Sequence, residues 1–212
     1  MAYNGSKLRD AGSMTNTNQT TLYLFRHGQT EWALSGQHTG RTDIPLTEAG
    51  RAQAAKLRDI VKHVKFDAVF VSPLSRARET AELAGFGEQL IPIDDLMEFD
   101  YGAYEGLTSK QIREGVPGWT VWTHPCPDGE TLENASARCK RVIEKANEAG
   151  GKVAVVAHGH ILRILTATWL NLPPSQGQHF MLDTSTISLL SHEHETPAVK
   201  IWNTPIDLIA CL

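Results

Sequence analysis

The feature that most constrains the fold of this chain is an alternation of two hydrophobic periods from Thr21 onward. Three short apolar runs, at residues 22–25, 68–72 and 153–157, are flanked by polar turns and predict buried strands. The segments between them carry apolar residues three and four positions apart, which is the helical period. Strands that alternate with helices predict an α/β fold, here a three-layer α/β/α sandwich around a mainly parallel sheet.

Four segments have helical period, and each has a residue that marks one of its ends. They are residues 57–64 with Thr47 as N-cap, a segment from Ser75 to Gly85 or Gly87, residues 132–146 ended by Gly150, and a segment from Gly159 to Trp169. Residues 180–202 predict two β segments around a polar turn at 192–197. Residues 100–128 are irregular, with a helix expected only at 109–114, and such a stretch is typical of a functional loop.

Length and charge are those of an ordinary globular domain. The 212 residues suffice for one core, and one domain is predicted. The net charge of −4 gives no electrostatic attraction for nucleic acid or an anionic membrane. No stretch approaches the roughly 20 apolar residues of a membrane span. We therefore expect no nucleic acid and no membrane as partner, and a phosphate site would have to be a local cluster of positive charge.

The N-terminus is polar and lacks the apolar centre of a secretion signal. We interpret residues 1–20 as a disordered leader or tag and residues 21–212 as the folded domain. Residues 12–14 are equally consistent with a remnant of a cloning vector that precedes a native start at Met14. The cysteines are odd in number and widely spaced, which argues against a disulfide framework or a zinc site: Cys126, Cys139 and Cys211. A buried free thiol at Cys139 and a reducing, cytoplasmic location are expected.

Cationic and imidazole side chains follow all three predicted strands. Arg26 and His27 follow the first strand, Arg76 lies four residues after Ser72 at the end of the second, and His158 follows the third. Ligands of open α/β sheets bind at the carboxyl ends of the strands, so these side chains should meet at one edge. Two guanidinium forks and two imidazoles around one point suit a tetrahedral dianion such as phosphate.

A phosphate site would use these residues in distinct ways. His27 can attack phosphorus if its attacking nitrogen is neutral, and His158 can donate a hydrogen bond to the charge that develops. Helices that start after each histidine would add their N-terminal amides, and Gly28 and Gly159 would let the backbone approach the anion. Taken singly, a histidine at a strand end is more often an ordinary polar residue, but the joint placement favours a site.

Four motifs in order resemble those of the histidine phosphatase superfamily, also called phosphoglycerate-mutase-like. They are LFRHGQTEW at 24–32, SPLSRARET at 72–80, EFDYGAYEG at 98–106 and AHGH at 157–160. The resemblance runs from about residue 22 to residue 192. It implies a phosphate pocket of Arg26, His27, Arg76 and His158, with His27 transiently phosphorylated and no cofactor or metal.

The resemblance also implies that Glu98 is the general acid that protonates the leaving alcohol and then activates water. Repulsion from the acidic residues Asp94, Asp95 and Asp100 is expected to raise its pKa. A solvated acidic loop is the alternative for this cluster.

The wall above the phosphate resembles that of sedoheptulose-bisphosphatase-type and broad-specificity acid phosphatases, through SGQHTG at 35–40 and WTVW at 119–122. The resemblance suggests a set of substrate contacts: Thr30, Gln37, His38, Thr39, Tyr101 and Gly159. His38 is expected either to be a partly protonated donor near neutral pH or to be an ordinary exposed loop residue. Trp119 and Trp122 either line the mouth of the pocket or pack under the loop.

Missing residues distinguish a hydrolase from a mutase. Mutases of the superfamily hold a substrate carboxylate with a lysine, where this chain has Ser109 beside Lys110, and with an Arg-Arg pair that is absent between residues 106 and 129. Ala33 also replaces an asparagine of the mutases. We therefore predict a phosphatase for small phosphomonoesters, sugar phosphates or bisphosphates, with mutase activity as the alternative. A non-catalytic phospholigand-binding module is a further alternative, although all five catalytic positions are occupied.

The histidines after the third predicted strand and in the C-terminal turn raise the possibility of a metal site. His158 and His160 could join His192 and His194 on paper, but Gly159 opens a helix and residues 192–194 suit a solvated turn, so no metal is expected. The expected partner is a small phosphorylated metabolite. The oligomeric state is left open, with a homodimer as one candidate.

Overall fold

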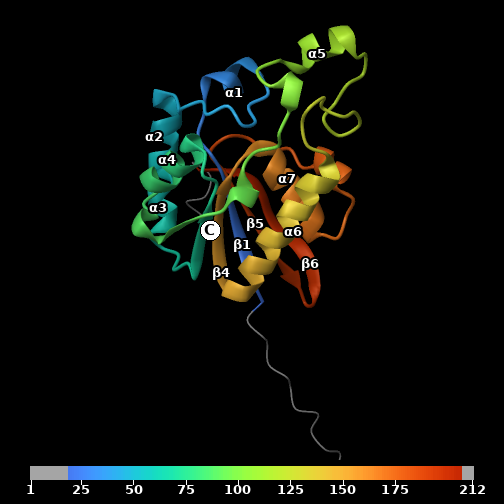
Figure 1. Ribbon diagram of the computed structural model, residues 1–212. Helices are drawn as coiled ribbons and strands as arrows, with labels where there is room; N and C mark the ends of the chain where they lie inside the picture. The colour runs from blue at the N-terminus through green and yellow to red at the C-terminus, as the bar shows by residue number, and fades with distance from the viewer. Residues whose placement is uncertain (1–18, 207–212) are drawn as a thin grey trace, which may run out of the picture.

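The computed structural model describes residues 19–206, and Figure 1 shows a central sheet with helices on both sides. Strands lie in the order β3-β2-β4-β1-β5-β6. Their bounds are β1 Thr21–Arg26, β2 Ala68–Val71, β3 Leu90–Pro92, β4 Lys152–Ala157, β5 Thr186–Glu193 and β6 Thr196–Pro205. β1 to β4 pair in parallel, whereas β5 and β6 pair antiparallel. The predicted α/β fold with a mainly parallel sheet is confirmed.

The helices form two layers on this sheet. The α-helices are α1 Glu31–Ser35, α2 Glu48–Lys56, α3 Arg58–Val61, α4 Ser75–Leu83, α5 Ser109–Gly115, α6 Leu132–Ala149 and α7 Gly159–Trp169. Short 3₁₀ turns are η1 Gly87–Gln89, η2 Asp94–Leu96, η3 Gly102–Tyr104 and η4 Pro174–His179. β4 is buried on both faces, because Val155 packs with the α6 and α7 residues and Val156 with those of α4.

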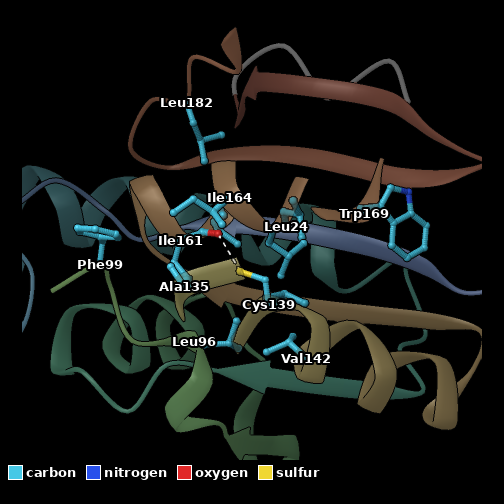
Figure 2. Close-up of a cluster of buried hydrophobic side chains, with 14 of the residues drawn as sticks. Leu24, Leu96, Phe99, Ala135, Cys139, Val142, Ile161, Ile164, Trp169 and Leu182 are labelled. Atoms are coloured by element: carbon cyan, nitrogen blue, oxygen red, sulfur yellow. Dashed lines mark hydrogen bonds between the residues drawn. The ribbon is translucent and has the colours of Figure 1, made fainter. Parts of the chain in front are cut away.

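The larger hydrophobic cluster lies under α6 and α7. Figure 2 shows Leu24 of β1 in this cluster together with Cys139 of α6 and Ile161 of α7. The thiol of Cys139 donates a hydrogen bond of 3.6 Å to the carbonyl of Ile161. Cys139 is free and fully buried, and burial raises its pKa. The predicted buried thiol is confirmed.

The helix predicted at residues 57–64 is wrong in its extent. Thr47 is the N-cap, as expected, but the helix that it caps is α2, which ends before Leu57. The amide of Leu57 closes a tight i→i−3 bond of 3.1 Å to Ala54, and the short α3 follows. Leu57 and Val61 still reach the core from two helices in place of one.

The C-terminal β prediction is correct in kind and shifted in place. Residues 180–185 are not a strand, β5 extends through His192 to Glu193, and the turn narrows to His194 and Glu195. His192 is therefore not in a solvated turn, since its ring packs on Trp169 with centroids 4.9 Å apart. β3 was not predicted, because its three residues at the sheet edge carry no periodic signal.

Two of the sequence predictions concern the ends of the chain. The expected leader falls largely in residues 1–18, and Cys211 falls in residues 207–212; both lie outside the described part of the chain. Within residues 19–206, no helix is long and apolar enough to cross a membrane.

Candidate active site

The ends of β1 and β4 bring the two predicted histidines together. Arg26 and Ala157 are partners in the parallel β1–β4 ladder, so His27 and His158 follow at the same level of the sheet. Their ring centroids are 5.1 Å apart. This arrangement is the convergence at strand ends that the sequence predicts.

His27 is buried and holds one nitrogen ready for attack. Its Nδ1 lies 2.7 Å from the carbonyl oxygen of Gly28, and a carbonyl can only accept, so Nδ1 carries the proton. In the neutral ring, Nε2 is therefore unprotonated. Burial, followed by the charges of Arg76 and Arg26, holds the pKa of His27 well below its usual value. His27 is thus kept as the neutral imidazole that a nucleophile requires.

Arg26 leaves a buried donor without a partner. Its Nη1 donates to the carbonyl of Leu182, whereas its Nε is buried and has no hydrogen-bond partner in the described part of the chain. Buried donors are nearly always paired, so we expect a ligand to provide the hydrogen-bond acceptor for Nε of Arg26. Gly159 packs against the guanidinium, where a Cβ would lie 3.3 Å from Cζ. The small size of Gly159 thus makes room for Arg26.

Arg76 and His158 form a fully buried pair beside His27. Nε of Arg76 donates to Nδ1 of His158 at 3.1 Å, and since Nδ1 accepts, the proton of the neutral ring lies on Nε2, 2.7 Å from the hydroxyl of Ser72. The amino groups of Arg76 donate to backbone carbonyls of the 39–42 segment: Thr39, Gly40 and Thr42. Both side chains are engaged with protein groups, so their contact with phosphate stays a prediction.

Glu98 is held by the start of α7. Its Oε1 accepts hydrogen bonds from the amides of Phe99 at 2.8 Å and Ile161 at 2.9 Å, and its Oε2 accepts one from His160 at 3.0 Å. These three donors orient the buried carboxylate at a helix N-terminus. The site therefore sets the direction of the carboxylate through backbone groups.

The acidic neighbours expected around Glu98 face other partners. Asp95 pairs with Arg141 at 2.6 Å, and Asp100 accepts from the amide of Gly102 at 2.9 Å and faces Arg41 at 3.8 Å. The predicted repulsion between these carboxylates and Glu98 is therefore not built into the site. The acidic sequence cluster is a set of separate ion pairs and turns.

A pocket of about 200 Å³ opens above His27. It is lined by nine of the predicted residues: Arg26, His27, Thr30, Gln37, His38, Thr39, Glu98, Tyr101 and Gly159. Six residues were not predicted: Trp32, Ala33, Gly36, His160, Arg163 and Leu182. Arg76 and His158 lie behind the pocket surface. His160 and Arg163 were missed although a sequence signal existed, since they are three residues apart in the predicted helix that starts at Gly159.

His38 differs from both alternatives that the sequence left open. It lines the pocket, lies 3.1 Å from the hydroxyl of Ser109, and packs on Tyr101 and Trp119. Burial, with the charge of Arg113 as a smaller cause, lowers its pKa to about 4. The expected partly protonated donor is thus wrong: His38 is neutral near pH 7 and can still donate or accept one hydrogen bond.

The polar residues beside His38 are tied to the backbone. Thr30 caps α1 by accepting from the amide of Ala33 at 3.2 Å, so the first helix after His27 starts only at Glu31. Gln37 donates to the carbonyl of Gly106 at 2.7 Å. Tyr101 shares a hydrogen bond of 2.6 Å with Nδ1 of His160, and burial raises its pKa well above the usual value. The wall is therefore rigid rather than a set of free side chains.

Gly28 has a different role from the one expected. A Cβ at this position would lie 2.6 Å from the carbonyl oxygen of Gly50 in α2, and the amide of Gly28 donates to the hydroxyl of Thr80 at 3.0 Å. The glycine lets the loop after β1 pack against α2, while its amide is already paired.

The tryptophans pack under the loop. Trp119 is buried in the larger core cluster, and Trp122 lies against His160 and beneath the guanidinium of Arg163, 4.6 Å from its ring centroid. Neither residue lines the pocket. Trp122 therefore supports two pocket residues from behind.

No cluster of three or more His, Cys, Asp or Glu side chains within residues 19–206 is arranged to hold a metal ion. The imidazole of His158 is engaged with Arg76 and Ser72, and that of His160 with Tyr101.

Comparisons with known proteins agree with this geometry. A family model of the histidine phosphatase superfamily (branch 1) matches residues 22–205. An acid phosphatase of Mycobacterium tuberculosis is 40% identical over 177 residues, which cover 82% of this chain and 87% of that protein. Sedoheptulose 1,7-bisphosphatase of Saccharomyces cerevisiae is 35% identical over 181 residues, 70% of this chain and 67% of that protein. The chain belongs to the histidine phosphatase superfamily.

Solved structures support the same assignment. The structure of an open reading frame product of Mycobacterium tuberculosis superposes with a TM-score of 0.84 at 37% identity, covering 88% of this chain and 98% of that one. A mycobacterial glucosyl-3-phosphoglycerate phosphatase superposes with a TM-score of 0.77 at 26% identity, covering 87% and 98%. The protein is an enzyme, a phosphatase of this superfamily, and the fold and family implied by its four motifs are confirmed.

Proposed function

We propose that this enzyme hydrolyses small phosphomonoesters, sugar phosphates or bisphosphates, through a phosphohistidine on His27. The observation that carries the proposal is the pairing of a neutral His27, whose Nε2 is free, with the unpartnered buried Nε of Arg26 in one pocket. A nucleophile next to an orphaned cationic donor suits a phosphoryl group that is anionic and electrophilic at once.

In the first step, Nε2 of His27 attacks phosphorus and the bond from phosphorus to the ester oxygen breaks. Glu98 gives its proton to the departing oxygen, which leaves as an alcohol. Arg26 binds the phosphoryl oxygens, and Arg76 stabilises them from behind. His158 turns its Nε2 proton from Ser72 toward the same oxygens.

In the second step, Glu98 removes a proton from water, and the resulting hydroxide attacks the phosphohistidine. The bond from phosphorus to Nε2 breaks, inorganic phosphate leaves, and both His27 and protonated Glu98 are regenerated. The reaction needs no metal ion. We expect full activity in the presence of a chelator, and loss of activity that zinc restores would contradict this.

The body of the substrate contacts the wall above the phosphate, through Gln37, His38, Thr39 and Tyr101, with Thr30 and Gly159 at the rim of the phosphate site. Most of these side chains already have one hydrogen bond, so each offers a single further donor or acceptor in a fixed direction. Such a wall suits a polyhydroxylated ligand. The names of the acid phosphatase and bisphosphatase relatives point to the same substrate class.

A screen of phosphorylated metabolites for phosphate release, reported as kcat/KM, tests this proposal. We expect sugar phosphates or bisphosphates to be the best substrates, and release from none of them would contradict it. Mutase activity is the second candidate, because a phosphoglycerate mutase of Cytophaga hutchinsonii is 30% identical over 90% of this chain. Interconversion of 3-phosphoglycerate that is faster than phosphate release would favour the mutase.

A further inference from the structure

Arg163 is a cation of the pocket wall that the chemistry at His27 does not use. It lies on α7, four residues after Gly159, and lines the same pocket as Arg26 and His27. Within residues 19–206 no carboxylate forms an ion pair with it. Burial is the main cause that lowers its pKa; Tyr101 and the carboxylate of Glu98 act in the opposite direction without forming an ion pair, and the charge of Arg26 adds to the lowering. A half-buried guanidinium without an anionic partner is unfavourable unless a ligand supplies the negative charge.

The guanidinium of Arg163 is fixed in place. Its Nε donates to the carbonyl of Gly177 at 3.1 Å, its Nη2 donates to the carbonyl of Gln178 at 3.1 Å, and the indole of Trp122 lies under it. A Cβ on Gly177 would lie 2.7 Å from the same indole, so the guanidinium, the indole and the backbone at Gly177 are closely packed. Nη1 has no hydrogen-bond partner in the described part of the chain and remains available to a ligand.

The charge of the pocket exceeds what one phosphoryl group requires. Arg26 lines it and Arg76 lies behind it, and together they match a phosphate dianion. The carboxylate among the described lining residues is Glu98, which accepts its hydrogen bonds from backbone amides. Two other lining side chains, His38 and Tyr101, are uncharged at neutral pH. The pocket thus has one further cationic side chain, Arg163, besides the two arginines assigned to the reacting phosphoryl group.

We propose that Arg163 binds a second anionic group of the substrate, a phosphate or a carboxylate, while the first phosphate reacts at His27. This inference rests on the proposed function and narrows its substrate class to small molecules with two anionic ends. The neutral donors of the wall then contact the hydroxyl groups between the two ends.

The test compares three substrates in wild type and Arg163→Gln: a ketose bisphosphate, the matching ketose monophosphate and p-nitrophenyl phosphate. We expect wild type to prefer the bisphosphate. Arg163→Gln should lower kcat/KM for the bisphosphate by about 10- to 100-fold, mainly through KM, because a charged hydrogen bond to the ground state is lost. The two monophosphates should change less than about threefold. The same comparison with a phosphorylated hydroxy acid in place of the bisphosphate shows whether the second anionic group that Arg163 binds is a carboxylate or a phosphate.

Two matched variants separate binding from packing. Arg163→Lys retains the charge and should recover part of the preference for the bisphosphate. Arg58→Gln removes a positive charge from α3, where Arg58 donates to the carbonyl of Leu83, and should leave all three substrates unchanged. An equal loss for all three substrates in Arg163→Gln would overturn the proposal, because a packing role predicts that result.

A binding measurement on wild type keeps the test decisive if Arg163→Gln fails to fold. The bisphosphate should inhibit hydrolysis of p-nitrophenyl phosphate at least about tenfold more strongly than the monophosphate does. Equal inhibition would overturn the proposal. If wild type hydrolyses none of the substrates, the proposed function fails separately, and calorimetric Kd values for the bisphosphate and the monophosphate decide the role of Arg163 in the same way.

Discussion

The floor and the wall of the pocket are built in different ways. The floor is formed by Arg26 at the end of β1 and His27 directly after it, and it is backed by His158, which follows β4. The parallel β1–β4 ladder in the middle of the sheet positions all three residues. The wall comprises segments 37–42 and 101–108, which are loops joined by a few hydrogen bonds. Examples are the amide of Gly106 to the carbonyl of His38 at 2.9 Å and the amide of Gly40 to Glu105 at 2.7 Å.

This difference indicates how chemistry and specificity are divided in the molecule. The backbone of the floor continues directly from strands of the hydrophobic core, so its position cannot shift without disturbing the packing of that core. The wall depends on loop contacts, which tolerate change at lower cost. Substitutions in the floor should therefore affect every substrate, whereas substitutions in the wall should affect substrates differently.

The largest expected effect is at His27. His27→Asn removes the nucleophile and should lower kcat at least about 10⁴-fold for every substrate. Measurement of phosphate release with a sugar phosphate and with p-nitrophenyl phosphate checks this. A similar loss for both substrates supports the division between chemistry in the floor and specificity in the wall. Substantial turnover of either substrate would contradict it.

Glu98→Gln should give the next largest effect, and its size should depend on the leaving group. An alkoxide needs a proton to depart, so kcat for a sugar phosphate should fall by about 10²- to 10³-fold. p-Nitrophenolate leaves without a proton, so its release in the first step should fall much less. Pre-steady-state release of nitrophenolate measures that step, and an equal loss for both substrates would argue against a proton donor at Glu98.

Glu105 links the wall to the floor. Its Oε1 accepts from the amides of Gly40 and Thr42, and carbonyls of the same segment hold Arg76. Glu105→Ala should therefore lower kcat/KM by about tenfold for all substrates, and Glu105→Gln, which retains an acceptor, should recover most of the activity. As a control, Glu79→Ala removes the partner of Arg51 on the helical layer and should leave kcat/KM unchanged.

The smallest expected effect is the pH dependence contributed by His38. Its pKa is about 4 in the fold, against 6.5 for the ordinary side chain. Between pH 6.5 and pH 4, His38 is therefore protonated in the unfolded chain but neutral in the folded chain. The free energy of unfolding consequently decreases as the pH falls from 6.5 toward 4. His38→Gln should reduce the drop in Tm between pH 7 and pH 5 by about 2–4 °C. The exposed His63→Gln serves as control, and equal slopes in both variants would contradict the burial of His38.

The position of the floor could be predicted from the strand ends alone. The lining residues of the wall were identified through the family resemblance, and their contacts and charge states could not be predicted, for physical reasons. Three apolar runs followed by Arg26, Ser72 and His158 are enough to place those residues at one sheet edge, because parallel strands end together. The state of His38 depends on tertiary burial against Tyr101, which no local pattern reports. Likewise, the acidic residues near Glu98 lie close in sequence, but Asp95 turns to Arg141 on a distant helix.

His160 and Arg163 could have been found by helical spacing. They lie three residues apart in the helix that starts at Gly159, at its second and fifth positions, so they share one face of that helix. The role of Gly28 was not accessible in this way, because it depends on the close approach of Gly50 from α2. A close contact between two backbone segments requires a glycine, but the glycine in the sequence does not reveal which segment packs against it.

The most direct test of the account is the identification of the phosphorylated residue. Wild type and Glu98→Gln are mixed with p-nitrophenyl phosphate that carries a radioactive phosphoryl group, because nitrophenolate leaves without a proton from Glu98, and are quenched in alkali, which preserves phosphohistidine. The account predicts label on His27 that is stable in alkali and lost in acid, with more label in Glu98→Gln because hydrolysis of the intermediate is slowed. Label on another residue, or rapid turnover without labelled protein in either enzyme, would contradict a phosphohistidine at His27.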